Sequence, residues 1–521
     1  MDNTRKVRVR FAPSPTGPLH MGGVRTALYN YFFAKQHGGD FILRIEDTDS
    51  NRFVPGAEEY IIRSLAWCGI TPDEGIDENS KVVETPSERH PHAPYRQSQR
   101  KPLYRKYAEE LVEKGFAYYA FDTSEEIDAR RKECEAKGET FVYGHANRLT
   151  FQTSLNMDEA ICKERLKNES HWTIRFKNPE NRVVKMHDLI RGEIEMNTST
   201  LDDKVLWKAA DQLPTYHLAN IVDDHLMEIS HVIRGEEWLP SLPLHYMLYE
   251  AFGWEDTMPQ FAHLSLLLKP DGKGKLSKRD GDRLGFPVFP LRWESATGEI
   301  SRGYREDGYY PEAFVNLIAL LGWNPGIEQE LFSLEELVKL FSLERVVKSG
   351  ARFNPDKAKW FNQEYLRRRS DSQLREEFLP ILAEHNITGV ENDFVEKVIS
   401  LVKERGHFVS DFWELSNFFF ERPSEYDPTS VKKFWKEEIL PLVREISDMI
   451  IGIEPFEKEV IEEKVHTFIT EGGYPMGKIM NALRLAIVGA SKGPGVADII
   501  ALIGKEEFSK RIDNALSTIS R

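Results

Sequence analysis

The sequence lacks the features that mark several classes of protein. Only three cysteines (Cys68, Cys134, Cys162) occur in 521 residues, none in a CxxC or CxC spacing, so a disulfide framework and a cysteine-rich zinc site are both unsupported. No apolar run approaches the roughly 18 residues that a membrane-spanning helix needs. The chain begins directly with a strand-like pattern, which predicts no signal peptide. We therefore expect a cytoplasmic protein with no membrane partner.

Composition indicates several folded domains. Hydrophobic residues make up 40% of the chain and aromatic residues 11%, which excludes wholesale disorder. At about 150 residues per domain, the length predicts three or four domains. The net charge of −15 argues against a basic surface over the whole protein. A protein with this net charge can still carry a local basic surface that binds RNA.

Hydrophobic periodicity predicts an α/β beginning. Residues 7–11 alternate as in a strand with one buried face, and residues 24–32 carry apolar side chains at helical spacing. A second apolar strand covers 41–45 and runs into the acidic segment 46–49. Strand, turn, helix and strand within about 45 residues are typical of a parallel nucleotide-binding half.

The pattern of charged and apolar residues changes twice further along the chain. Residues 104–208 are more charged and mix helical with short strand-like segments, and α/β texture resumes at 216–233, so this stretch looks inserted. Beyond about 330 the pattern is helical, with a capping box at Ser333–Glu336 and breaks at 472–473 and 492–495. The sequence shows no internal repeat and no low-complexity tract.

A turn rich in proline and glycine follows the first strand. It reads Ser14-Pro-Thr-Gly-Pro-Leu-His20-Met-Gly22-Gly23. Glycines at a strand-to-helix turn let backbone approach a ligand, and free N–H groups at a helix start attract phosphate. It matches neither a GxGxxG nor a GxxxxGK[ST] loop, so a nucleotide site here belongs to another class. The alternative is a simple turn with a capping histidine.

A second candidate segment, Lys269-Pro-Asp-Gly-Lys-Gly-Lys275-Leu-Ser-Lys278-Arg279, lies far downstream. Two lysines on a glycine-hinged loop can close over a triphosphate and neutralise charge on departing pyrophosphate. Taken alone, a solvated lysine turn is the alternative interpretation.

Together the two segments resemble the two signatures of class I aminoacyl-tRNA synthetases. Further motifs narrow the resemblance to bacterial glutamyl-tRNA synthetases. They are Arg10–Gly17, Arg44–Asp49, Thr215–Asn220, Val222–His225, Arg234–Trp238 and Gly308–Ala313, with weaker likeness through the helical half.

The resemblance implies an α/β Rossmann-like class I synthetase catalytic domain with an inserted α/β acceptor-binding domain, followed by an all-α anticodon-binding half. The expected divisions are the first catalytic half at 1–103, the acceptor-stem insertion at 104–208, the second catalytic half at 209–265, a stem-contact region with the KLSKR loop at 266–330, and the helical half at 331–521.

The same resemblance implies the reaction and its partners. L-glutamate and ATP would give glutamyl-adenylate and pyrophosphate, and the glutamyl group would pass to the terminal adenosine of tRNA-Glu. Mg²⁺ would accompany ATP, held chiefly by the phosphates. We expect a monomer that activates glutamate only with tRNA bound.

Site residues are carried over motif by motif. The catalytic residues implied are His20, Lys275 and Lys278, and the ATP-binding residues are Ser14, His20, Gly22, Gly23, Lys275 and Lys278. The glutamate-binding residues implied are Arg10, Ser14, Glu46, Tyr216, Asn220 and Arg234. Arginine binds carboxylate bidentately, and Glu46 could meet the substrate ammonium. The alternatives are a solvated edge-strand position for Arg10 and a turn cluster for the acidic residues, above all Asp47.

The chain departs from the family pattern in three places. Gly23 stands where a second histidine is common, which shifts work to His20 and the lysines. The stretches 119–122 and 143–146 lack the thiolates that hold zinc in some members, so we expect no zinc and no other bound metal site. The segment 284–307 is longer than usual, and we expect it to pack as an insertion rather than to touch RNA.

Several alternatives stay open on the sequence alone. The runs Arg367–Arg369 and 432–436 could contact RNA phosphates or be solvated helix faces. A non-catalytic tRNA-binding or regulatory paralogue is the alternative function, opposed by the intact site residues. A truncated tRNA-modifying paralogue would lack the helical half, and a glutaminyl enzyme would not need two arginines. Whether tRNA-Gln is also charged is not determined by the sequence.

Overall fold

The structure is a computed structural model that describes residues 5–49 and 52–519. The chain divides into two compact units. Unit 1 takes in residues 1–307 and 314–355, and unit 2 takes in residues 308–313 and 356–521.

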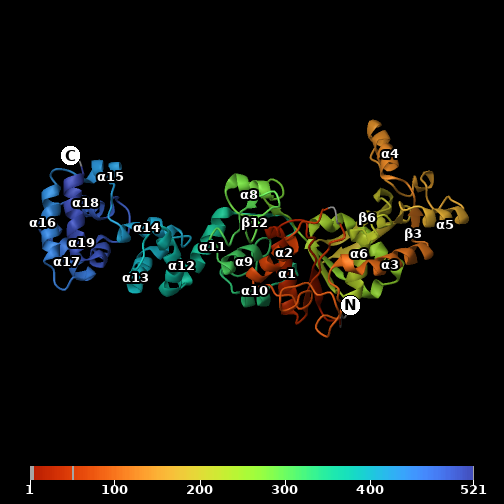
Figure 1. Ribbon diagram of the computed structural model, residues 1–521, viewed down its shortest axis with the longest axis horizontal. Helices are drawn as coiled ribbons and strands as arrows, with labels where there is room; N and C mark the ends of the chain where they lie inside the picture. The colour runs from red at the N-terminus through yellow and green to blue at the C-terminus, as the bar shows by residue number, and fades with distance from the viewer. Residues whose placement is uncertain (1–4, 50–51, 520–521) are drawn as a thin grey trace. The chain divides into compact units, whose positions relative to one another are not determined.

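Unit 1 begins with the predicted strand, helix and strand. Strand β1 (Arg8–Phe11) pairs in parallel with β2 (Asp40–Leu43), and α1 (Met21–Gln36) connects them. Helix α1 packs against β1 and β2, and this packing contributes to the burial of its apolar residues. The predicted order of strand, helix and strand is confirmed (red in Figure 1). The expectation that the first strand buries one face is wrong, because all four residues of β1 are buried.

A mostly parallel sheet continues from this start. Its strand order is β6-β5-β10-β9, with β9, β10 and β5 parallel and β6 antiparallel at the edge. The Ser230 N–H donates to the Arg8 carbonyl over 2.8 Å, which brings β1 beside the start of β9. Parallel strands present their carboxyl ends at one edge of a sheet, where ligands bind in α/β folds. The strands are β5 (Val183–Asp188), β6 (Gly192–Asn197), β9 (His231–Gly235) and β10 (Gln260–Leu264).

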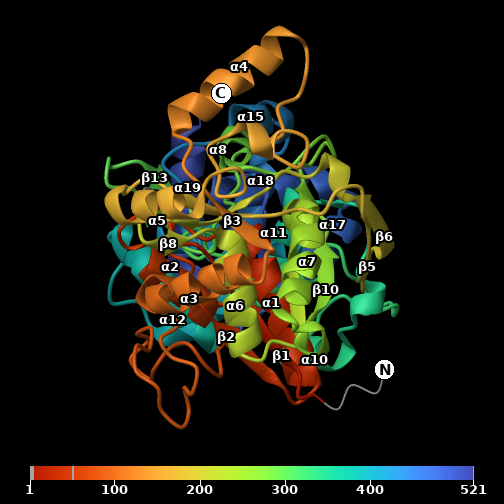
Figure 2. The ribbon, with the colours of Figure 1, turned by 90° about the vertical axis from the view of Figure 1, so that its right-hand side faces the viewer.

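A second, antiparallel sheet has the order β3-β4-β7-β8. Helix α4 (Ser124–Ala136) projects away from it in both ribbon views and has no buried residue (Figures 1 and 2). The segment 104–208 therefore supplies strands to both sheets, since β5 and β6 join the parallel one. The bounds are β3 (Ala117–Ala120), β4 (Thr173–Phe176), β7 (Val205–Lys208) and β8 (Leu213–Pro214).

The other elements of unit 1 surround these sheets. Two short pairs, β11 with β14 and β12 with β13, lie in the later part of the unit. The helices are α2 (Ala57–Trp67), α3 (Lys101–Glu113), α5 (Glu159–Asn168), α6 (Tyr216–Leu226), α7 (Leu242–Phe252), α8 (Lys278–Leu284) and α10 (Leu334–Leu340), while α9 (Pro311–Ala319) contains residues of both units. The short strands are β11 (Leu267–Leu268), β12 (Trp293–Glu294), β13 (Ile300–Ser301) and β14 (Ala351–Arg352).

Unit 2 is built of helices, and its C-terminal helices share one core. Figure 1 shows α16 to α19 packed side by side, and isoleucines such as Ile446, Ile461 and Ile479 form their shared interior. The predicted breaks are confirmed, because α17 ends at Glu471 and α18 ends at Val488. The bounds are α11 (Pro355–Arg368), α12 (Asp371–Glu384), α13 (Asn392–Val402), α14 (Asp411–Phe420), α15 (Pro428–Phe434), α16 (Leu440–Ile451), α17 (Lys458–Glu471), α18 (Met476–Val488) and α19 (Val496–Thr518).

Across the described ranges 5–49 and 52–519, no helix is both long enough and apolar enough to cross a membrane. The predicted capping box is present at the start of α10, where Ser333 and Glu336 exchange side-chain and backbone hydrogen bonds.

Candidate active site

His20 caps the helix that follows the first strand. Its Nδ1 accepts a hydrogen bond from the Gly22 N–H at 3.1 Å. The neutral ring therefore carries its proton on Nε2. That Nε2 is buried and has no hydrogen-bond partner in the described part of the chain. Burial, with the nearby Lys275 charge, lowers the pKa of His20 to about 4, so at neutral pH the side chain is an uncharged donor that awaits an acceptor.

A pocket of about 310 Å³ opens at this turn. Four of the six predicted ATP-binding residues line it: Ser14, His20, Gly23 and Lys278. Gly22 is engaged through His20, whereas Lys275 is not among the lining residues. Phe289, Trp293 and Ser295 line the pocket from the longer segment 284–307.

A side chain at position 23 would press on the side chain of Leu19. A Cβ atom at this position would lie 2.5 Å from Leu19 Cδ1 and 3.9 Å from the Phe11 ring. A histidine side chain there would require this packing to change, and real Cβ atoms do not approach so closely.

The KLSKR loop joins β11 to α8. Gly272 and Gly274 have φ of +76° and +87°, conformations that favour glycine, and they shape the turn before Lys275. Lys275 Nζ lies 3.5 Å from Glu237 Oε1, and Lys278 Nζ lies 2.7 Å from Glu299 Oε1. Both ammonium groups thus face carboxylates that a triphosphate would have to displace.

A buried ionic network near the ends of β1 and β2 consists of four side chains, Arg10, Arg44, Glu46 and Asp224. Arg10 donates from Nε and Nη2 to Asp224 at 3.1 and 3.2 Å, and Arg44 Nη1 donates to Asp224 at 2.8 Å. Arg44 Nη2 lies 3.1 Å from Glu46 Oε1. Arg10 is only 4% exposed, which excludes the solvated edge-strand interpretation.

Glu46 and Asn220 meet within this network. Asn220 Nδ2 donates to Glu46 Oε1 at 3.3 Å, while Asn220 Oδ1 is buried without a hydrogen-bond partner among the described residues. Burial raises the pKa of Glu46 above its usual value, although Arg44 and Arg10 oppose the rise. A ligand cation beside Glu46 would favour its charged form and satisfy the amide oxygen.

Arg234 and Tyr216 form the adjoining group. Arg234 Nη1 donates to the Tyr216 hydroxyl at 3.0 Å, and Arg234 Nη2 is buried without a partner in the described residues. Tyr216 stacks on Trp238 with ring centres 3.9 Å apart. Burial raises the pKa of Tyr216, while the positive charges of Arg234 and Arg10 oppose the rise.

Some side chains at the candidate site were not singled out by the sequence reasoning. Arg44 and Asp224 lie inside motifs that carry the family resemblance. Their charges within those motifs could have identified them as candidate site residues. Trp293 and Ser295 lie in the longer segment, for which no local pattern indicated the pocket. Asp47 instead holds Ser98, accepting from its N–H at 2.8 Å and its hydroxyl at 2.6 Å, which is a structural role across 51 positions of the chain rather than a local turn.

The stretches compared with a zinc site make ordinary protein contacts. The Tyr143 hydroxyl donates to Asp122 at 3.0 Å, and the Tyr143 ring stacks on Phe151. In residues 5–49 and 52–519, no cluster of three or more His, Cys, Asp or Glu side chains is arranged to hold a metal ion.

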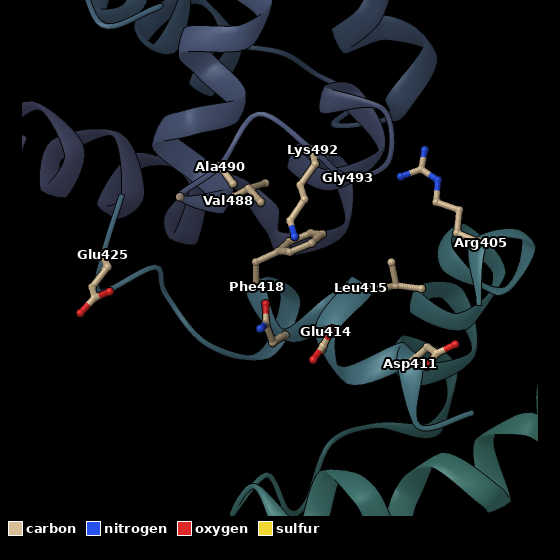
Figure 3. Close-up of a pocket in the computed structure, with 12 residues that line it drawn as sticks. Arg405, Asp411, Glu414, Leu415, Phe418, Glu425, Val488, Ala490, Lys492 and Gly493 are labelled. Carbon is tan, nitrogen blue, oxygen red and sulfur yellow. The ribbon is translucent and has the colours of Figure 1, made fainter. Parts of the chain in front are cut away.

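Unit 2 contains a polar pocket of about 670 Å³ between α14 and the loop after α18 (Figure 3). Arg405 and Lys492 line it, and Lys492 extends toward the Phe418 ring. By contrast, Arg367 at the end of α11 pairs with Glu364 and Glu404, while the next residue, Arg368, is exposed.

Comparison with known families agrees with this geometry. Residues 6–360 match the model of the class I tRNA synthetases (E and Q), catalytic domain, and residues 373–516 match an anticodon binding domain. The chain is 55% identical to the glutamate–tRNA ligase of Flavobacterium johnsoniae over 516 residues, covering 99% of this chain and 100% of the relative. It is also 55% identical to that of Phocaeicola vulgatus, with 99% of both chains covered.

Solved structures lead to the same family. A crystal structure of a glutamate tRNA ligase from Elizabethkingia meningosepticum, in complex with its amino acid, superposes with a TM-score of 0.93 at 51% identity, covering 99% of this chain and 100% of that one. The glutamate-tRNA synthetase of Elizabethkingia anophelis gives a TM-score of 0.91, also at 51% identity and with the same coverage. The predicted fold class is confirmed, with a class I catalytic part and a helical anticodon-binding part. The chain therefore belongs to the class I tRNA synthetases, as a member of the glutamate–tRNA ligases.

Proposed function

We propose that this protein is an ATP-dependent glutamate–tRNA ligase that activates L-glutamate and transfers it to the 3′-terminal adenosine of tRNA-Glu. The observation that carries the proposal is a set of three buried polar atoms without hydrogen-bond partners in the described chain: His20 Nε2, Asn220 Oδ1 and Arg234 Nη2. Buried polar groups normally find partners, so unpartnered atoms on residues that the family motifs also single out are places where a ligand can bind.

Each of these atoms suits one charged part of the substrates. The His20 Nε2–H can donate to a phosphate oxygen of ATP. Asn220 Oδ1, next to Glu46, can accept from the glutamate ammonium. Arg234 Nη2–H can donate to the side-chain carboxylate of glutamate, with Tyr216 beside it and Arg10 in the adjoining network.

Activation requires no covalent intermediate with the protein. An oxygen of the glutamate α-carboxylate attacks the α-phosphorus of ATP, and the bond to pyrophosphate breaks. In the second step the 2′-hydroxyl of the terminal adenosine attacks the glutamyl carbonyl carbon and AMP leaves. The protein contributes by holding the reacting atoms together and by stabilising developing charge.

Lys278 and Lys275 are the proposed groups for the departing pyrophosphate. Lys278 lines the pocket beside His20, and Lys275 is close enough for its charge to lower the pKa of His20. Closure of the glycine-hinged loop would bring both ammonium groups to the phosphates as negative charge accumulates there.

Mg²⁺ is proposed to arrive with ATP. Because no ready-made carboxylate cluster is found in the described residues, the phosphates themselves would supply most of its ligands. Its chemistry would be to neutralise phosphate charge. We propose no zinc.

The helical unit is the proposed site for the anticodon end of tRNA. The pocket in Figure 3 offers Arg405 and Lys492 for phosphates and Asn417 for a base edge. Lys492→Ala should weaken tRNA-Glu binding with little effect on the Michaelis constant KM for glutamate. We further propose a cytoplasmic monomer. Sedimentation of the purified protein would test the monomeric state.

The function is tested by aminoacylation with radiolabelled glutamate on pure tRNA-Glu and tRNA-Gln transcripts in parallel. Charging of tRNA-Glu alone would establish a discriminating ligase, and charging of both would establish a non-discriminating one. If a folded protein charged neither with ATP and Mg²⁺ present, the regulatory alternative would replace the proposal.

A further inference from the structure

Arg234 is held by a buried chain of polar contacts that begins outside the substrate site. Arg234 Nε donates to His263 Nε2 at 3.0 Å, and His263 Nδ1 lies 2.6 Å from Asp188 Oδ2. The Asp188 and His263 side chains are both fully buried. The three residues lie at or near the carboxyl ends of the neighbouring parallel strands β9, β10 and β5.

The contacts fix the protonation of His263. An arginine can only donate, so His263 Nε2 must be an unprotonated acceptor. The single proton of the neutral ring is then on Nδ1, where it is donated to Asp188. If the ring carried its proton on Nε2 instead, two N–H groups would face each other and the contact with Arg234 would be lost.

Asp188 is itself fixed by the backbone. Its Oδ1 accepts from the N–H groups of Ile190 and Arg191 at 3.0 and 2.8 Å. Burial raises the pKa of the Asp188 carboxyl, but the hydrogen bonds from His263 and from these N–H groups outweigh it and the pKa is lowered overall. Asp188 is therefore a charged acceptor of set orientation.

The remaining contacts of Arg234 leave one nitrogen for a ligand. Nη1 donates to the Tyr216 hydroxyl and lies 3.3 Å from His245 Nδ1. With Nε and Nη1 both bound, the planar guanidinium cannot rotate, and Nη2 is the nitrogen that is buried without a partner in the described chain.

We propose that Asp188 and His263 are positioning residues that hold the Arg234 guanidinium in the orientation that receives the side-chain carboxylate of glutamate. The inference rests on the proposed function and on Arg234 as the glutamate receptor. Around metal ligands, altering the neighbour that fixes a histidine tautomer and its direction changes affinity by about tenfold or more, and we expect a similar effect for a guanidinium held in the same way.

Two substitutions at His263 separate positioning from simple packing. Asparagine places an amide near the Nδ1 position, which keeps the contact with Asp188 and removes the acceptor for Arg234. Glutamine places an amide oxygen near the Nε2 position, which keeps that acceptor. Asp188→Asn alters the other end, because an amide cannot accept both from His263 and from the two backbone N–H groups.

The experiment measures kcat and KM for glutamate in aminoacylation of tRNA-Glu at saturating tRNA and ATP. KM does not depend on the fraction of enzyme that is folded, so partial misfolding would not imitate the result. Arg234→Lys is included to test the receptor. His187→Gln is the matched control, since His187 precedes Asp188 and forms an exposed pair with Glu193 at 2.6 Å.

We expect His263→Asn and Asp188→Asn to raise KM for glutamate about tenfold with kcat and KM for ATP nearly unchanged, and His263→Gln to raise it clearly less. Equal effects of the two His263 variants, or a fall in kcat alone, would overturn the inference. If Arg234→Lys raised KM while Asp188→Asn left it unchanged, only the inference would fail. If Arg234→Lys left KM for glutamate unchanged in an active enzyme, the assignment of Arg234 as the glutamate receptor in the proposed function would fail as well.

Discussion

Lys278 Nζ and Glu299 Oε1 lie 2.7 Å apart, which ties the second lysine of the KLSKR loop to the hairpin of the longer segment. Glu299 stands between the two strands of that hairpin, β12 and β13, and Trp293 on β12 packs edge-on against Tyr60 with ring centres 5.2 Å apart. The segment 284–307 is therefore packed, and it also borders the pocket beside His20.

Glu299→Gln should lower KM for ATP by up to about fivefold, because an exposed ion pair is worth up to about 1 kcal/mol and ATP no longer has to break it. Steady-state aminoacylation at varied ATP checks this. Glu294→Gln is the control, since Glu294 lies on the same hairpin but 3.8 Å from Arg292. A higher KM for ATP in Glu299→Gln would mean that this carboxylate assists nucleotide binding.

Lys278→Ala should reduce the rate of glutamate activation about 10²-fold or more while tRNA binding stays nearly intact, because the lysine acts on charge that develops in the transition state. Pyrophosphate exchange with tRNA present measures the rate, and filter binding measures the affinity. Lys273→Ala, a change on the same loop, should have little effect. An unaltered exchange rate in Lys278→Ala would remove that residue from catalysis.

Local patterns in the sequence were sufficient for the start of the fold. Alternation at residues 7–11 and helical spacing at 24–32 were sufficient to predict β1 and α1. The alternation did not show that β1 is buried on both faces, because its arginines are covered by ion pairs with distant residues. The site residues came from motifs, and Ser14, His20, Gly23 and Lys278 do line one pocket.

Local sequence patterns could not predict which distant segments pair with one another in the fold. Strand β5 lies in the chain between β4 and β7, yet it pairs with β10 in the other sheet. The contact between Asp188 and His263 joins residues 75 positions apart. A buried strand looks alike in either sheet, so its partner is decided by packing over the whole domain rather than by its own residues.

Asp224→Ala should lower the free energy of unfolding by about 3–5 kcal/mol, because it leaves the buried Arg10 and Arg44 without their shared carboxylate. Urea unfolding followed by tryptophan fluorescence measures the change. Asp128→Ala removes an exposed partner of Arg131 in the same unit and should cost less than about 1 kcal/mol. Equal losses in the two variants would show that the network around Asp224 adds no stability.

His231 should make stability depend on pH above the range in which most carboxylates titrate. Burial, then the charges of His37 and Arg5, lower the pKa of His231 from 6.5 to about 4. Between these values the unfolded chain binds a proton that the folded chain does not, so stability falls as the pH falls.

The test compares wild type with His231→Asn by urea unfolding at pH 7.5 and pH 5. Each pH unit inside the window corresponds to about 1.4 kcal/mol, so wild type should lose about 2 kcal/mol more than the variant. His187→Asn, a change at an exposed ring, should follow the wild type. Parallel losses in wild type and His231→Asn would mean that the folded protein accepts the proton at His231 as readily as the unfolded chain, which contradicts a ring buried in its neutral form.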